Sequence, residues 1–320
     1  MTIGIPKALL YYQYAVLWET FFTYLGCDVV ISDTTNEAVV QNGARDSISE
    51  CCLPAKTYLG HVNALLSHCD YILSPYAVSK YGGDAICTRF WGIGDVIRHT
   101  YPTANLLEYA LHEGGYKPQY KSFRAIGKKL GKRSGLTRSA YETAVQAQNL
   151  HDKNLQQAQS SLLLSDGLKV LLAGRSYVMH DPYIGGTITD ILSDLGCITI
   201  FSDHFDRKDT IRHASDISPR LYWTASQAAI GAIAAHKKNI DGVLMLTTFP
   251  CAPDALAFEM AARVVKDVPI ALILLDGLHG EAGLYTRIES FIDILSSKKP
   301  DGGKAPRPNT LSYERKIHSE

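Results

Sequence analysis

The chain contains 320 residues, of which 46% are hydrophobic and 20% are charged. This length allows about two domains with complete hydrophobic cores, and the composition is that of a globular chain rather than a disordered one. Because 32 basic residues balance 32 acidic residues, the chain lacks the overall cationic field that holds nucleic acid, and we expect no nucleic-acid partner.

The first residues lack the basic region and apolar core of a secretory signal, and no apolar run is long enough to span a bilayer. We therefore expect a cytoplasmic protein with no membrane partner. In that compartment cysteines are more often thiols or metal ligands than disulfides. The chain has seven cysteines, and an odd number argues against complete pairing.

The first half begins with a predicted strand over 2–6, a helix over 11–25 and a second strand over 27–32. A strand, helix and strand of this length form a right-handed crossover in a parallel sheet. The pattern then predicts a helix over 36–42 and a second helix that opens within 50–56 and runs to about 69. A strand over 70–74, which ends in Pro75, and a helix over 93–100 follow.

A basic segment over 117–133 and a polar helical segment over 139–164 follow. A helix that is polar all round is commonly a connector between domains. The basic run either touches the phosphates of a coenzyme or is a solvated charged face, and the second interpretation is the commoner one.

A second α/β unit mirrors the first. Its predicted elements are four strands, over 168–174, 197–201, 241–246 and 269–275, and four helices, over 186–195, 221–237, 255–265 and 283–295. The sequence therefore predicts an α/β protein with a unit over 1–118, a helical bridge over 119–166, a second unit over 167–295 and a disordered tail over 296–320.

Three cysteines, Cys52, Cys87 and Cys251, lie in turns rich in glycine or proline, in loops or at predicted helix starts. Cys251 follows a buried strand, at the carboxyl edge where open α/β sheets bind ligands, and Cys52 lies near a helix N-terminus, which favours thiolate. These cysteines are either independent structural residues or converging ligands of an iron–sulfur cluster that leaves one iron without a cysteine.

The other four cysteines have different settings. Cys27, Cys69 and Cys197 lie at strand starts or a helix end within hydrophobic sequence and are expected to be structural, whereas Cys51 is ambiguous. The absence of a CxxC pair disfavours a zinc ribbon, a thioredoxin-type pair and a ferredoxin run.

Several motifs stand in a fixed order along the chain: Ile3-Gly4-Ile5-Pro6-Lys7-Ala8-Leu9 with Tyr11-Tyr12, Cys52-Leu53-Pro54-Ala55-Lys56, Cys87 with Arg89-Phe90, Tyr177 with Asp181-Pro182-Tyr183, Cys251 with Pro253-Asp254, and Glu281-Ala282-Gly283 with Thr286-Arg287. Over nearly all of residues 1–295 the chain thereby resembles the acyl-CoA dehydratase activase-related proteins. That family is related to 2-hydroxyacyl-CoA dehydratase and benzoyl-CoA reductase subunits and to double-cubane cluster proteins.

The resemblance implies two Rossmann-like (flavodoxin-like) domains that face each other across a cleft. It also implies a [4Fe–4S] cluster, single or double-cubane, held by Cys52, Cys87 and Cys251. In the relatives, electrons reach the cluster from a separate iron–sulfur ATPase, the activase. This chain contains no GxxxxGK[ST] loop, so the resemblance implies such a partner here.

Four further residues are candidates for roles at the site. Lys7 and Tyr11 follow the first strand, at the ligand-binding edge, and are candidate cofactor-binding residues, although an ordinary surface role fits them equally well. His279 and Glu281 are candidate acid–base residues, and a surface histidine and a helix N-terminal carboxylate are the alternative readings. The chain departs from the family pattern at Pro250 and Ala252, and again just before His279.

Three functions remain open at this point. The first is an iron–sulfur protein that accepts low-potential electrons from an activase and passes them to a small molecule or acyl-CoA substrate. The second is a 2-hydroxyacyl-CoA dehydratase subunit, and the third is a cluster-free binding or regulatory module. A homodimer is compatible with each of them.

Overall fold

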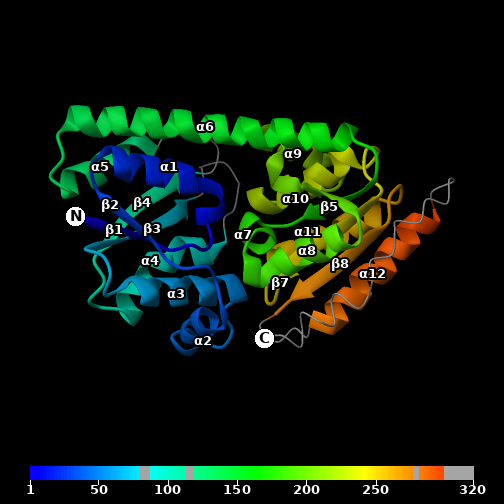
Figure 1. Ribbon diagram of the computed structural model, residues 1–320, viewed down its shortest axis with the longest axis horizontal. Coiled ribbons are helices and arrows are strands. Elements are labelled where there is room, and N and C mark those ends of the chain that lie inside the picture. Colours follow the sequence, from blue (N-terminus) through cyan, green and yellow to red (C-terminus); the bar gives the residue numbers. More distant parts are fainter. Residues whose placement is uncertain (79–86, 113–118, 277–280, 299–320) are drawn as a thin grey trace.

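The computed structural model describes residues 1–78, 87–112, 119–276 and 281–298. Its described residues form two four-stranded, all-parallel sheets with helices around each, arranged side by side (Figure 1). The predicted α/β class with two parallel sheets is confirmed. Both sheets place their strands in the same order, second, first, third and fourth along the chain, so the second half repeats the topology of the first.

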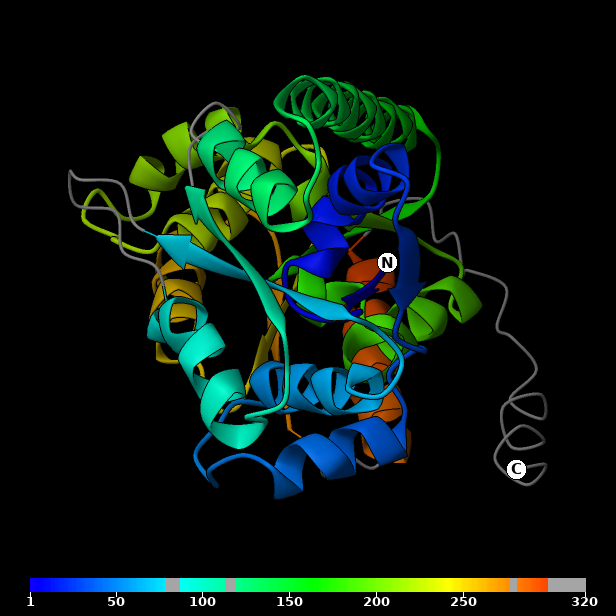
Figure 2. The same ribbon diagram turned by 90° about the vertical axis from the view of Figure 1, so that its left-hand side faces the viewer.

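The N-terminal sheet consists of β1 (Thr2–Ile5), β2 (Asp28–Ile31), β3 (Tyr71–Val78) and β4 (Leu106–His112). Figure 2 shows helix α1 (Tyr11–Tyr24) with α5 (Tyr120–Lys129) on one side of this sheet, and α3 (Leu53–Leu65) with α4 (Thr88–Thr100) on the other. Large aromatic side chains fill the space under α1 and α5, and Trp18, Phe21, Phe22, Tyr109 and Phe123 are all at most 2% exposed.

The predicted end of the third strand is wrong. Strand β3 continues through Pro75 to Val78, and Pro75 is in register with Tyr109 of β4. The recorded pairing with β1 covers only Tyr71 and Ile72. A proline that lacks an N–H is tolerated where a strand has a partner on one side only. Strand β4 has no counterpart among the predicted elements.

Helix α2 (Glu37–Arg45) packs directly against α3 through glycine. A Cβ atom at Gly43 would lie 1.8 Å from the backbone oxygen of Lys56, and one at Gly60 would lie 1.9 Å from that of Val39. Only glycine permits so close an approach of two helix backbones. The pair of helices holds the N-terminus of α3, and with it Cys52, in position.

The C-terminal sheet consists of β5 (Leu168–Ala173), β6 (Cys197–Phe201), β7 (Gly242–Thr248) and β8 (Ile270–Leu275). Every residue of β7 is buried, as expected of a central parallel strand. Two hydrophobic clusters cover the two faces of the sheet. The helical segments of this half are α7 (Ser176–Met179), η2 (Pro182–Gly186), α8 (Thr187–Asp194), η3 (Ser202–His204), α9 (Arg207–His213), η4 (Ala214–Asp216), α10 (Thr224–His236), α11 (Ala252–Val264) and α12 (Glu281–Ser297).

Helix α6 (Ser134–Leu164) lies along both halves of the molecule (Figure 1). Its 31 residues correspond to about 46 Å, and it packs against α1 and α5 at one end and against β6 and η3 at the other. Two buried glutamines hold it. Gln148 accepts a hydrogen bond from the Leu17 N–H at 3.0 Å, and Gln159 exchanges two hydrogen bonds with the Phe201 backbone, at 2.6 and 2.8 Å.

The segment predicted to bridge the two units thus forms α5 and α6, while the exact domain limits stay a prediction. Of the predicted tail over 296–320, residues 299–320 lie outside the described residues. Within the described residues, no helix combines the length and the apolar character needed to cross a membrane.

Candidate functional site

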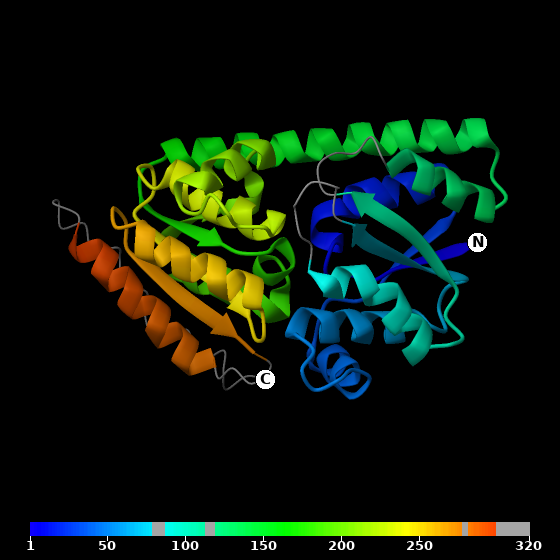
Figure 3. The same cartoon turned by 180° about the vertical axis from the view of Figure 1, so that it is seen from behind.

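The three candidate cluster cysteines share one local position: each is the N-cap residue of a helix. Cys52 precedes α3, Cys87 precedes α4 and Cys251 precedes α11. In Figure 3 these helices begin at the boundary between the two halves of the molecule. The first-turn N–H groups of a helix lack intrahelical partners and the helix dipole is positive there, which opposes the rise in pKa that burial causes at Cys52 and Cys251.

Electrostatic effects link Cys52 to Cys87, and they link Tyr177 to both Cys52 and Cys251. Burial raises the pKa of the Cys52 thiol, the Ala55 N–H lowers it, and the neighbouring Cys51 and Cys87 raise it further. Burial raises the pKa of Tyr177 well above its usual value, and Arg175 opposes this effect. Acidic neighbours, which include both Cys52 and Cys251, raise it further. Tyr177 therefore lies within electrostatic reach of cysteines from both halves.

The Cys251 thiol is held protonated by its surroundings. Burial raises its pKa to about 12, and the Asp254 carboxylate adds to the effect while Arg175 opposes it. The thiol lies 3.3 Å from Asp254 Oδ2, to which it donates. A metal centre takes thiolates, so binding at Cys251 would displace this proton.

A buried ion pair supports the loop around Cys251. The Arg175 guanidinium donates to both carboxylate oxygens of Asp254 at 2.9–3.0 Å, and Ser226 bridges the two, donating to Asp254 at 2.8 Å. Arg175 is 9% exposed and Asp254 is 2% exposed. Because Arg175 follows β5 and Asp254 lies in the first turn of α11, the pair fixes the carboxyl ends of two strands against each other.

A cavity of about 100 Å³ lies between the two halves. Cys87 and Phe90 line it from the N-terminal half, and Arg175, Tyr177 and Asp203 line it from the other. The Phe90 and Tyr177 rings are 5.7 Å apart across the boundary. The cavity is thus a space where a small molecule can contact residues at the carboxyl edges of both sheets.

Cys27, Cys69 and Cys197 lie at the amino ends of strands β2, β3 and β6. The Cys69 sulfur lies 3.1 Å from the Leu65 carbonyl and leaves no room for a Cβ atom at Gly4. Burial raises the pKa of Cys197 to about 11. In parallel sheets the amino ends lie opposite the carboxyl edges, so these three cysteines are at the far edge from the N-caps of α4 and α11.

That Cys52, Cys87 and Cys251 hold an iron–sulfur cluster stays a prediction. Cys thiolates are the usual ligands of such clusters. In such a cluster, each of the three cysteines would bind a different iron.

A chain of hydrogen bonds, which runs from Lys7 to Asp181, joins the two halves of the molecule. The Lys7 N–H donates to Ser32 Oγ at 2.8 Å, and Ser32 Oγ lies 2.9 Å from Nδ1 of the fully buried His61. On the other side of the ring, Nε2 lies 3.0 Å from Thr35 Oγ1, which donates to Asp181 at 2.6 Å. The bonds agree with one arrangement, in which neutral His61 accepts at Nδ1 and donates from Nε2.

Asp181 collects contacts from both halves. Tyr12 Oη donates to it at 3.1 Å from the N-terminal half, and the backbone N–H groups of Tyr183 and Ile184 donate at 2.9 and 3.1 Å within its own half. Burial raises the pKa of this carboxyl, while its hydrogen bonds oppose that effect. The Asp181-Pro182-Tyr183 motif therefore has a structural role at the domain boundary.

The candidate cofactor-binding residues have partners inside the protein. Lys7 Nζ donates to Thr34 at 3.1 Å, and Tyr11 Oη donates to Glu19 at 3.2 Å. Burial, with Glu19, raises the pKa of Tyr11 to about 12. Their role toward a cofactor stays a prediction, as do those of the acid–base candidates: His279 lies outside the described residues, and Glu281 begins α12 with its side chain not described.

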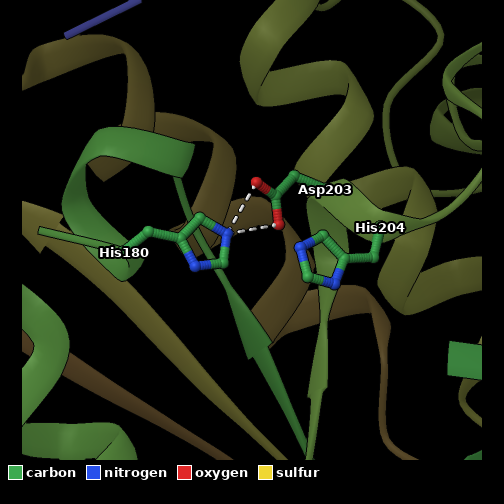
Figure 4. A group of neighbouring side chains, drawn as sticks. All are labelled: His180, Asp203 and His204. Atoms are coloured by element: carbon green, nitrogen blue, oxygen red, sulfur yellow. Dashed lines mark hydrogen bonds and ion pairs between the residues drawn. The ribbon is translucent and has the colours of Figure 1, made fainter. Parts of the chain in front are cut away.

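A group that the sequence analysis does not single out lies at the carboxyl ends of β5 and β6. His180, Asp203 and His204 converge there (Figure 4). Burial lowers the pKa of His180, but the Asp203 carboxylate outweighs that effect and raises it. Burial tends to raise the pKa of Asp203, yet His180 brings it down to about 2. Arg175 and the pair Asp203-His204 could have been found from their places just after predicted strands, whereas His180 carries no comparable sequence pattern.

Fold and site together define an α/β protein with two parallel sheets and a cysteine-bearing region between its halves. The chain belongs to the family described as the CoA enzyme activase uncharacterised domain (DUF2229), whose model matches residues 2–205. Cys52 and Cys87 lie within the matched region and Cys251 beyond it. The family name associates the chain with CoA enzyme activase systems. A search of curated proteins found no match.

Proposed function

We propose that this chain is an iron–sulfur protein that accepts low-potential electrons from an ATP-dependent activase and passes them to a small molecule or an acyl thioester. Cys52, Cys87 and Cys251 would hold a [4Fe–4S] cluster. The observation that carries the proposal is that these cysteines, far apart in sequence, are N-caps of three helices that begin at one boundary. Such a cluster supplies one-electron chemistry and an iron open to an oxygen ligand.

The chain's own residues have defined tasks in this proposal. The first-turn N–H groups of Ala55 and Asp254 oppose the rise that burial causes in the pKa of Cys52 and Cys251, so they would help to stabilise thiolates once a cluster displaces the protons. Arg175 is a fixed cation within reach of Cys251, and its ion pair with Asp254 keeps the α11 N-terminus in place. The cavity lined by Cys87, Phe90 and Tyr177 gives a substrate access to the same boundary.

The activase is assigned to a partner because this chain has no GxxxxGK[ST] loop and because its family is associated with CoA enzyme activase systems. Reduction of an unactivated acyl thioester needs a very low potential, so an ATP-driven electron donor is required. A 2-hydroxyacyl-CoA dehydratase subunit would use the same cysteines, and the choice between the two depends on the product formed.

The first experiment is purification without oxygen, followed by iron and sulfide analysis. We expect equal amounts of iron and sulfide and a brown absorbance in the wild-type chain. Cys251→Ala should lose both, whereas Cys197→Ala, which changes a cysteine at the opposite edge of its sheet, should retain both. Equal iron in the wild type and Cys251→Ala would refute the ligand assignment, and a wild type without iron would favour the cluster-free module.

The second experiment tests the partner. Reductase or dehydratase turnover is measured without oxygen, with and without an iron–sulfur ATPase, and with MgATP or a non-hydrolysable nucleotide. Activity should appear only with the partner and MgATP. Full activity of the chain alone with a mild reductant would remove the electron-accepting role.

A further inference from the structure

A second group of metal-ligating side chains lies apart from the cysteines. His180 follows the short helix α7, and Asp203 and His204 belong to η3, directly after β6. One ligand atom from each of the three lies within 4.8 Å of the other two. All three side chains are half-buried, and they come from two segments held by neighbouring strands, β5 and β6.

An ion pair explains only part of this group. His180 Nε2 lies 3.0 and 3.2 Å from the two oxygens of Asp203. The His204 ring lies parallel to the His180 ring, with an interplanar angle of 10° and a centroid distance of 5.2 Å. Among the residues that the structure describes, none makes a hydrogen bond to the His204 ring. The ion pair between His180 and Asp203 does not need the His204 imidazole beside it. A metal ion does, because His204 supplies its third ligand.

The surroundings hold the two rings in place. The Phe201 ring packs against both, at 4.8 Å from His180 and 5.1 Å from His204. The Phe201 backbone is in turn fixed by its two hydrogen bonds to Gln159 of α6. The ligand atoms are therefore set by packing before any ion binds, which lowers the ordering cost of binding.

We propose that His180, Asp203 and His204 bind one divalent transition-metal ion of the zinc or iron(II) type. Two imidazoles and one carboxylate are the protein ligands of such ions where other coordination positions stay open. Mg²⁺ and Ca²⁺ prefer oxygen ligands and are disfavoured here. Asp203 also lines the cavity between the halves, so the open positions can be taken by water or by a small oxygen ligand in that cavity.

This site is independent of the proposed cluster, because it uses nitrogen and oxygen donors rather than thiolates. The probe is Co²⁺ alone, added to the full chain. Cobalt bound to thiolate shows intense near-ultraviolet charge-transfer absorption, whereas cobalt on nitrogen and oxygen ligands shows only weak visible bands. The two kinds of bound ion can therefore be counted separately in one titration.

We expect one Co²⁺ per chain with the nitrogen and oxygen spectrum. His204→Gln should bind this ion at least tenfold more weakly, and Asp203→Asn should behave alike. The matched control is His213→Ala, because His213 and Asp216 form an exposed pair at 3.2 Å that belongs to no three-ligand group among the residues that the structure describes. Its binding should equal that of the wild type.

Circular dichroism without metal checks that each variant is folded. Anomalous diffraction from wild-type crystals soaked in Co²⁺ gives a result that does not depend on any variant, and we expect a peak among the three side chains. The proposal is overturned by a wild type without the nitrogen and oxygen bands, by His204→Gln with wild-type affinity, or by an anomalous peak only at cysteines.

Discussion

Acidification should destabilise the fold through one histidine, His61. This side chain is 0% exposed and is enclosed between Ser32 and Thr35. Burial, with a smaller effect of Lys7, lowers its pKa from 6.5 to about 4. The unfolded chain therefore binds a proton at His61 at a higher pH than the folded chain does.

The sign and size follow from this difference. Between pH 6.5 and about 4 the unfolded state binds more protons, so the free energy of unfolding falls as the pH falls through that window. The contribution of neutral His61 is fully present above pH 6.5. A difference of roughly 2.5 pKa units corresponds to a loss of about 3 kcal/mol at pH 4, which is a large share of the stability of a typical domain.

The assay is urea unfolding at several pH values between 7 and 4, for the wild type and His61→Gln. Glutamine stays neutral across this range, so the other titrating groups cancel in the comparison. His61→Gln should be less stable at pH 7, because it cannot reach both hydroxyl partners. The wild type should then lose about 3 kcal/mol more than the variant on going to pH 4. Parallel stability curves for the two proteins would refute the burial of a neutral imidazole.

Two further predictions concern packing and charge, and urea unfolding at pH 7 measures both. Gly43→Ala should lower the free energy of unfolding by about 3 kcal/mol or more, because its Cβ meets the backbone of α3 at 1.8 Å. Gly92→Ala in α4 is the control: nothing lies within 4 Å of its new Cβ, so it should be neutral or stabilising by up to about 1 kcal/mol. Equal losses of stability in the two variants would contradict the close crossing of α2 and α3. Arg175→Met should lower the free energy of unfolding by about 3–5 kcal/mol, because it leaves the buried Asp254 charged and without its cation. Adding Asp254→Asn should recover part of that loss. A double variant no more stable than Arg175→Met would contradict the ion pair.

Local sequence determined most of the elements. The apolar runs of β5 and β7 predict buried strands because parallel strands are covered on both faces, and the helical spacing over 11–25 predicts α1. The local settings of Cys52, Cys87 and Cys251 could also be predicted from the sequence, because proline and glycine mark the turns in which these cysteines lie. The limits of elements were less well determined: α4 begins at Thr88 rather than at 93, and α11 at Ala252 rather than at 255.

Where the sequence misled, pairing between distant segments was responsible. Pro75 signals a strand end when read alone, and only the neighbouring β4 shows that the strand continues. The family motifs carry the cluster expectation, but the motifs cannot show that their three cysteines all cap helices at one boundary. That arrangement depends on how the two halves pack against each other at this boundary.

Tertiary structure alone decided the polar groups of the site. Arg175 and Asp254 are 79 positions apart, and Thr35 and Asp181 are 146 apart. Asp181 and Asp254 stand in sequence motifs, but no periodicity or spacing pairs them with Thr35 and Arg175, because whole strands and helices lie between the partners. His180 joins Asp203 and His204 for the same reason: β5 and β6 are adjacent in the sheet, so residues that follow their carboxyl ends are brought together whatever their distance along the chain.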